Sequence, residues 1–249
     1  MKFIAIIPAR YASTRFPGKP LVNLGGKPII QWVYERVSQV FENTFVATDD
    51  SRIYETVVGF GGKVIMTKDT HPSGTDRCHE AYLKSGIEAD VVVNVQGDEP
   101  FIDASQLECI KGCFTDTSIH IATLVKPFKE NDPIEYLENP NTPKVVIDNE
   151  NNALYFSRSV IPYLRGVEKT EWTKVQTFYK HIGLYAYRTD VLSQITKLPQ
   201  GILEKAESLE QLRWLQAGYK IKTGVTTIET IGIDTPEDLQ RAEALLLSM

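Results

Sequence analysis

Apolar, β-branched runs alternate with helix-period segments through the first half of the chain. The runs at 3–7, 44–47, 63–66 and 91–95 predict strands. The last run is almost continuously apolar, which is typical of a parallel strand covered on both faces. Apolar residues at helical spacing predict helices over 28–40, 51–60, 76–84 and 104–114. This alternation indicates an α/β fold with a mostly parallel central sheet and right-handed crossovers.

The pattern loosens after residue 120. The segment 126–143 is rich in proline, asparagine and glutamate, so we expect it to loop out. Further on, the sequence predicts a strand pair, another strand and two helices, at 144–147, 153–156, 181–187, 207–217 and 236–247. We therefore predict one domain over residues 1–249, with a smaller inserted lobe at approximately 126–180.

Composition narrows the class of protein. A chain of 249 residues with 42% apolar and 24% charged residues is an ordinary globular protein. Its net charge of −5 argues against nucleic acid as a partner. No run is long enough to cross a bilayer, and 3–7 is too short for a signal peptide, so we expect no membrane insertion. The three cysteines are best explained as reduced thiols of a cytoplasmic protein; they are Cys78, Cys109 and Cys113.

The first predicted strand leads into a cationic loop. Arg10, Arg15 and Lys19 lie within ten residues, and prolines at 8, 17 and 20 stiffen the segment. Guanidinium forks and a lysine ammonium are suited to polyphosphate oxygens. In a parallel α/β sheet, ligands bind at the carboxyl ends of strands, where this loop begins. The loop has neither a Walker nor a Gly-x-Gly-x-x-Gly pattern, and a solvated surface turn is the alternative.

Two acids follow predicted strands far apart in the sequence. Asp98 closely follows the apolar run at 91–95, and Asp234 lies between an apolar segment and the start of a helix. Mg²⁺ prefers one or two carboxylates together with phosphate oxygens, so the pair could hold this ion beside a polyphosphate. The alternatives are an Asx-type turn at Asp98 and a helix cap at Asp234.

Three other segments carry polar candidates. Small residues around Ser73 and Gly74 could present backbone amides to a nucleobase or a phosphate, although a helix cap is an equal alternative. Arg158 could bind a substrate carboxylate through two hydrogen bonds. From the sequence alone, His181 is better explained as an ordinary strand residue.

Seven segments taken together resemble the 3-deoxy-manno-octulosonate cytidylyltransferases, or CMP-KDO synthetases. They lie in order at 8–21, 73–77, 93–100, 153–158, 181–188, 207–213 and 232–239. The resemblance implies a Rossmann-like nucleotidyltransferase fold whose lobe serves dimerisation or substrate binding. It also implies a cytoplasmic homodimer that depends on Mg²⁺ and acts in lipopolysaccharide biosynthesis. Pro143 departs from the aliphatic residue expected there, which affects only the detail of the lobe.

The resemblance implies that the anomeric hydroxyl of KDO attacks the α-phosphorus of CTP, giving CMP-KDO and pyrophosphate. It assigns the CTP site to Arg10, Arg15, Lys19, Ser73, Gly74 and Arg77. The KDO site would comprise Gln96, Arg158, His181, Tyr185, Glu210 and Gln211. Mg²⁺ would be held by Asp98 and Asp234, and the residues acting in catalysis would be Arg10, Lys19 and Asp98.

Three alternatives stay open at this point. A cytidylyltransferase for sialic acid would differ around 181–185 and 210–211, where this chain resembles the KDO type. A nucleotidyltransferase for phosphosugars would call for an additional basic acceptor site, and none is evident in the sequence. A non-catalytic nucleotide-binding module would lack the paired acids.

Overall fold

The computed structural model describes residues 1–12, 16–228 and 232–248, which form two compact units. The first unit contains 1–108, 186–196 and the C-terminal segment from 229. The second contains 109–185 and 197–228, and it includes the lobe predicted at 126–180. No helix in the described ranges combines the length and apolar character needed to span a membrane.

The first unit is built on four parallel strands. β1 (Phe3–Ala9) lies between β4 (Thr44–Thr48) and β6 (Val91–Asn94), and β5 (Val64–Met66) pairs with the far side of β4. Residues 4–7 of β1 and 91–93 of β6 are fully buried. The four strands predicted from the apolar runs are confirmed. The runs were a reliable signal because strands covered on both faces need nearly continuous apolar sequence.

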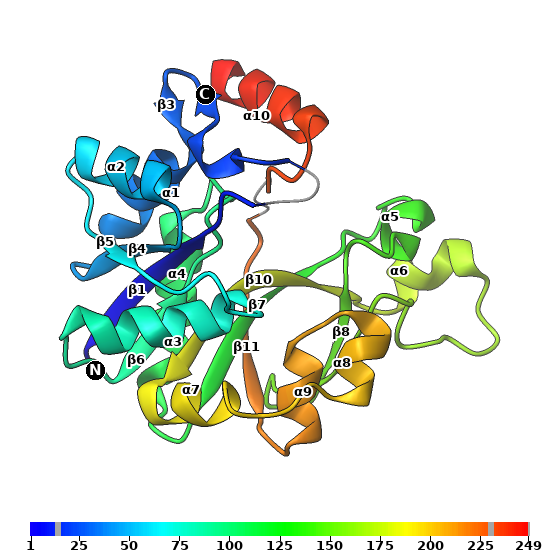
Figure 1. The fold of residues 1–249 in the computed structure, drawn as a ribbon. Coiled ribbons are helices and arrows are strands. Elements are labelled where there is room, and N and C mark those ends of the chain that lie inside the picture. Colours follow the sequence, from blue (N-terminus) through cyan, green and yellow to red (C-terminus); the bar gives the residue numbers. More distant parts are fainter. Residues whose placement is uncertain (13–15, 229–231, 249) are drawn as a thin grey trace. The chain divides into compact units, whose positions relative to one another are not determined.

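Helices connect these strands and complete the first unit. The predicted helices are present in this unit as α1 (Ile29–Ser38), α2 (Ser51–Gly59), α3 (Gly74–Ser85) and α10 (Pro236–Ser248), and α4 (Ala104–Gly112) continues from it into the second unit. α7 (Thr189–Ile195) was not predicted. In Figure 1, α10 lies beside the hairpin of β2 (Asn23–Leu24) and β3 (Lys27–Pro28). Leu24, Ile29 and Ala242 share one apolar cluster, so packing joins the C-terminal helix to the N-terminal region.

The second unit also has a sheet. β7 (Ile121–Pro127) lies between the parallel β11 (Ile221–Val225) and β10 (Tyr179–Arg188), whose last residues belong to the first unit. β8 (Lys144–Ile147) and β9 (Ala153–Ser157) form the predicted antiparallel pair, and β8 also pairs with β10. Figure 1 shows α5 (Ile134–Glu138) and α6 (Trp172–Val175) together at one end of this unit.

Two sequence-based predictions for the second unit were wrong. The segment 126–143 is not one loop, because it contains the end of β7 and all of α5. The helix predicted over 207–217 begins only at α9 (Gln211–Gln216), because residues 208–210 separate it from the preceding α8 (Ile202–Glu207). The break occurs at Ser208, whose φ of 52° lies in the left-handed region and ends α8. The apolar spacing continues across this turn, which explains the error.

Gly97 allows the chain after β6 to approach β1 closely. A Cβ at this position would lie 2.8 Å from the backbone oxygen of Pro8. We expect Gly97→Ala to lower the free energy of unfolding by about 1–3 kcal/mol, since backbone must move to relieve this contact. Gly112→Ala is the matched control: a Cβ there meets nothing within 4 Å, and φ is −59°. Urea denaturation of both variants tests the prediction, which equal stability changes would contradict.

Candidate active site

The N-terminal loop leaves β1 and is closed by its own backbone. The Gly18 amide donates to the Tyr11 carbonyl over 2.9 Å, and Gly18 has a φ of +71°. The Arg52 guanidinium lies 3.3 Å from the centre of the Tyr11 ring, which fixes one side of the loop by a cation–π contact. Arg15, predicted to bind phosphate, lies outside the described residues.

The structure brings together Lys19 and the two predicted metal-binding acids. The Lys19 ammonium forms an ion pair with Asp98 and a second one with Asp234, whose Oδ1 is 2.9 Å away. Lys19 is only 9% exposed. Its burial alone would lower its pKa, but the charges and hydrogen bonds of Asp98 and Asp234 outweigh burial and raise the pKa. Lys19 is therefore held as a cation.

Backbone contacts explain why two distant acids converge. The Ile233 amide donates to the Asp98 carbonyl over 2.9 Å, which joins the end of β6 to the segment before α10. The Asp238 carboxylate then accepts from the amides of Asp234 and Thr235. Thr235 accepts in return from the Asp238 amide, so Thr235 caps this helix in place of Asp234, the alternative that the sequence offered. The helix start thereby determines the position of Asp234.

The donor set at this point suits a magnesium ion. Two carboxylates reach one cationic group, and both are partly exposed, with side-chain exposures of 27% for Asp98 and 46% for Asp234. Within the described ranges, no group of three or more His, Cys, Asp or Glu residues could hold a metal. A metal here would rest on two carboxylates and complete its shell with water or substrate oxygens, as Mg²⁺ commonly does.

A cavity of about 390 Å³ opens beside this cluster. Its lining brings together loop cations, residues that follow β6, the first residue of α3 and the acid before α10, namely Arg10, Lys19, Gly74, Gln96, Asp98 and Asp234. Both cations and carboxylates therefore line the cavity, and Lys19 pairs with the two acids. A polyphosphate accompanied by a divalent ion would complement both kinds of charge.

Ser73 has the helix-cap position that the sequence left as an alternative. Its Oγ accepts from the Asp76 amide over 3.2 Å at the start of α3 and also donates to the Asp76 carboxylate. Gly74, one residue further, lines the cavity. The cap and a ligand-binding role are compatible, because the backbone of the same turn faces the cavity at Gly74.

Arg77 is fully buried beneath the site. Its guanidinium donates to Thr67 over 2.5 Å and pairs with Asp49 over 2.9 Å. These contacts connect α3 to the ends of β4 and β5. Arg77 is absent from the cavity lining, so its proposed part in CTP binding rests on the resemblance alone. Asp49 was missed in the sequence analysis, because a single acid after a strand has no distinctive pattern.

A second network orients Arg10. Its Nη2 donates to the His71 carbonyl over 2.6 Å, while the His71 ring pairs with Glu80 of α3. Glu80 also accepts from the Lys68 amide and pairs with Lys84 over 2.7 Å. Burial lowers the pKa of Arg10, and the charge of Arg77 lowers it further. His71 lay in a segment singled out by the sequence, but Glu80 gave no signal because its partners are distant.

We predict that acid weakens the fold through Glu80. Burial would raise its pKa, but hydrogen bonds from Lys84 and His71 lower the pKa to about 2 from an ordinary 4.5. A carboxylate with a depressed pKa stabilises the fold above about 4.5, and this stabilisation disappears as the pH falls toward about 2. Unfolding measured from pH 5 to 2 should therefore show a smaller pH dependence in Glu80→Gln. Parallel curves for both proteins would contradict this prediction.

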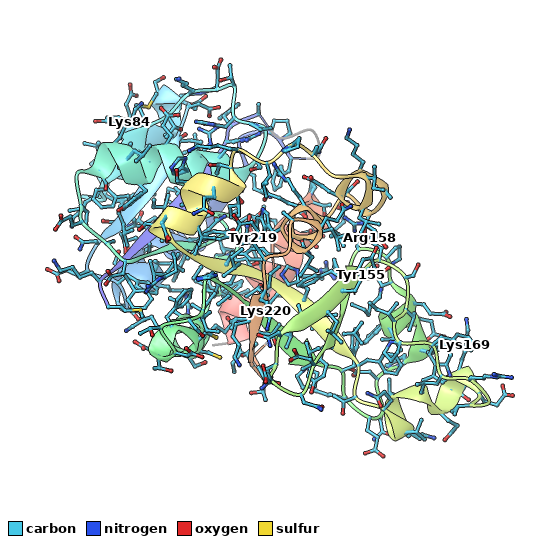
Figure 2. The ribbon with its side chains drawn as sticks, turned by 90° about the horizontal axis from the view of Figure 1, so that it is seen from below. Lys84, Tyr155, Arg158, Lys169, Tyr219 and Lys220 are labelled. Carbon is cyan, nitrogen blue, oxygen red and sulfur yellow. The ribbon has the colours of Figure 1, made fainter. Side chains whose placement is uncertain are left out.

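The other residues expected to bind the sugar acid lie in the second unit, except for Gln96. Arg158 directly follows β9, and Figure 2 labels it together with Tyr155 of this strand. The Arg158 Nε donates to the Glu207 carbonyl over 2.6 Å, and its Nη1 donates to the Pro140 carbonyl over 2.8 Å. The Glu207 carboxylate in turn accepts from the Arg158 amide. These contacts hold the guanidinium at the break between α8 and α9.

His181 and Tyr185 pack against each other on β10. Their ring centroids are 5.2 Å apart, and Tyr185 also meets the Trp214 ring edge to face. His181 Nε2 lies 3.0 Å from the Thr123 hydroxyl. Burial lowers the pKa of His181 to about 3, so the ring is neutral near pH 7. A neutral ring in this surrounding can hydrogen-bond a sugar hydroxyl without adding charge.

Glu210 and Gln211 lie at the start of α9. Glu210 pairs with Arg213 over 2.9 Å, and Arg213 also binds Glu204. Gln211 is 4% exposed, and its Nε2 has no hydrogen-bond partner in the described part of the chain. A buried amide of this kind is a group that a polar ligand could satisfy.

The fold and the cavity define a nucleotidyltransferase-type α/β protein with paired carboxylates. A family model described as cytidylyltransferase matches residues 4–221. The chain therefore belongs to the cytidylyltransferase family.

Full-length relatives specify the position within this family. The chain is 66% identical over 246 residues to the 3-deoxy-manno-octulosonate cytidylyltransferase of Phocaeicola vulgatus, covering 99% of this chain and 98% of that protein. It is 46% identical over 248 residues to the protein of this name from Escherichia coli, covering 98% and 96%. These matches confirm the resemblance found in the sequence.

A solved structure agrees with the fold. The chain is 44% identical to CMP:2-keto-3-deoxy-manno-octonic acid synthetase solved in complex with CTP, with a TM-score of 0.91 and coverage of 100% and 99% of the two chains. This likeness confirms the predicted α/β fold class with a mostly parallel sheet. A glucose-1-phosphate thymidylyltransferase shares the fold alone, at 18% identity and a TM-score of 0.65.

Proposed function

We propose that this protein transfers CMP from CTP to the anomeric hydroxyl of 3-deoxy-D-manno-octulosonate, releasing pyrophosphate. The observation that carries this proposal is the 66% identity, over 99% of the chain, to a protein named for this activity. The cavity at the end of β1 supports it, because loop cations and paired carboxylates line the same space. Neither a cytidylyltransferase for sialic acid nor a nucleotidyltransferase for phosphosugars is supported by a comparable identity.

The chain's own residues supply charge and position. Arg10 and Lys19 would contact the triphosphate and balance the charge that grows on pyrophosphate as the bond to the α-phosphorus breaks. Gly74 and the Ser73 turn would receive the cytosine. Asp98 and Asp234 would hold Mg²⁺. When bound, this ion would withdraw charge from phosphate oxygens and favour ionisation of the attacking hydroxyl.

The acceptor would be recognised by residues of different chemistry. Arg158 would bind the carboxylate that distinguishes a keto-sugar acid from a neutral sugar. The sugar hydroxyls would meet neutral or acidic groups, contributed by Gln96, His181, Tyr185, Glu210 and Gln211. We also propose a cytoplasmic homodimer in lipopolysaccharide biosynthesis, with an interface in the lobe at 126–180. Exposed Tyr136, Tyr163 and Val175 support this interface.

Pyrophosphate release tests the reaction directly. The purified protein is incubated with CTP, MgCl₂ and KDO, with sialic acid and no acceptor as controls. We expect release that requires KDO and stops with EDTA. Release with sialic acid alone would retain the nucleotide assignment and overturn the acceptor. Sedimentation velocity on the same sample tests the dimer.

Arg158 offers a separate test of acceptor recognition. Arg158→Lys keeps the charge but loses the two-pronged geometry, so we expect KM for KDO to rise by roughly tenfold or more. KM for CTP should stay within about twofold, because the guanidinium donates to carbonyls of its own unit, at Glu207, Pro140 and Ser208. Lys169→Gln, which removes an exposed ion pair with Glu138, is the control. An equal rise in both KM values would indicate a structural role for Arg158.

A further inference from the structure

The Lys19 ammonium stands where the two acids would share a metal ion. It pairs with Asp98 and, over 2.9 Å, with Asp234. Both contacts join one nitrogen to two carboxylates from segments more than a hundred residues apart. The side chain of Lys19 is 11% exposed, so the ammonium is largely withdrawn from water and neutralised by these acids.

A lysine and a divalent ion compete for the same oxygens in such an arrangement. An ammonium donates hydrogen bonds to carboxylate lone pairs, and a magnesium ion needs those lone pairs for coordination. Two positive groups cannot both be bound at one carboxylate pair without strong repulsion. Coordination of a metal by both acids is therefore opposed for as long as Lys19 pairs with both of them.

The cavity gives Lys19 another partner when nucleotide is present. Lys19 and Arg10 line the same space, and Arg10 is held at the His71 carbonyl rather than at the acids. A triphosphate entering this space would offer Lys19 anionic oxygens in place of the carboxylates. The exchange keeps the ammonium paired throughout, which avoids leaving a buried charge unpaired.

We propose that Lys19 occupies the position of the metal between Asp98 and Asp234, and so acts as a cation placeholder. Its ammonium prevents a divalent ion from binding to this pair until the phosphates of a nucleotide bind Lys19 instead. This inference rests on the proposed function, because it takes the two acids as the metal site. It assigns Lys19 two successive partners, first the carboxylates and then the phosphates. Metal binding is consequently coupled to nucleotide binding, and the free protein has low affinity for the metal alone.

Binding of Mn²⁺ to the nucleotide-free protein tests the proposal without any turnover. Free Mn²⁺ is followed by its electron paramagnetic resonance signal, which is largely lost on binding. We expect Lys19→Met to bind Mn²⁺ at least about tenfold more tightly than the wild type, since a charged hydrogen-bonding competitor has been removed. Lys19→Gln provides a second variant if the first is unstable by circular dichroism.

Two controls separate competition at the acids from a general change in charge. Arg10→Gln removes a cation from the same cavity lining that contacts a carbonyl instead of the acids, so its effect should be much smaller. Lys27→Met removes an exposed lysine paired with Glu35 and should leave Mn²⁺ affinity unchanged. Adding Asp98→Asn to Lys19→Met should abolish the gain.

The outcomes distinguish the two proposals. If the Lys19 variants bind Mn²⁺ no better than the wild type, while Asp98→Asn weakens Mn²⁺ binding in the presence of CTP, the metal site stands and the placeholder is overturned. If Asp98→Asn and Asp234→Asn leave Mn²⁺ binding with CTP unchanged, the metal site itself is overturned. A gain in Arg10→Gln equal to that in Lys19→Met would also overturn the placeholder.

Discussion

Asp98→Asn should lower kcat for pyrophosphate release by roughly 10²–10³-fold at saturating Mg²⁺, the usual cost of losing one charge-stabilising group in an active site. The amide keeps the size of the side chain but removes the negative charge that pairs with Lys19 and would hold the metal. The loss should therefore appear mainly in kcat rather than in KM for KDO. Steady-state kinetics with both substrates varied measures kcat and the KM for each substrate.

Glu99→Gln is the matched control for this experiment. It neutralises the neighbouring carboxylate, which is absent from the cavity lining. We expect its kcat to stay within about threefold of the wild type, in keeping with the small effect of a charge away from the reacting atoms. A kcat of Asp98→Asn within a few-fold of the wild type would remove Asp98 from catalysis, and an equal loss in both variants would point to damage to the loop.

Arg77→Met should cause the largest loss of stability, roughly 3 kcal/mol or more. The substitution leaves Asp49 without its buried guanidinium partner, and breaking a buried pair from one side is costly. It also removes the hydrogen bond to Thr67. The loss should appear in chemical denaturation as a lower midpoint, and it should occur without ligands, because the contacts lie within the protein.

Lys27→Met provides the comparison for the Arg77 variant. Lys27 and Glu35 form an ion pair with 40% exposure on each side, so we expect a change below about 1 kcal/mol. Residual activity of Arg77→Met, measured well below its unfolding midpoint, separates stability from substrate binding. A stable but inactive Arg77→Met would contradict the structural role and favour direct contact with CTP.

The local sequence determined the strands, the cationic loop and the capped C-terminal helix. Residues 3–7 and 91–95 are nearly continuous apolar runs, which are typical of parallel strands buried on both faces. The helix over 236–247 was predicted from its local sequence, and its cap is formed by Thr235 and Asp238, which are three residues apart. The segment 207–217 was misread, because its apolar spacing does not reveal the left-handed turn at Ser208.

The tertiary structure decided which polar groups meet. Asp98 and Asp234 are adjacent because the Ile233 amide binds the Asp98 carbonyl, a contact between segments distant in sequence. The resemblance assigned Arg77 to CTP, and the cationic loop assigned Lys19 to phosphates, while folding buries Arg77 against Asp49 and places Lys19 between the acids. Charge and residue type are local properties, but burial and the choice of partner depend on the whole chain, so the sequence identified the chemistry and the fold determined its arrangement.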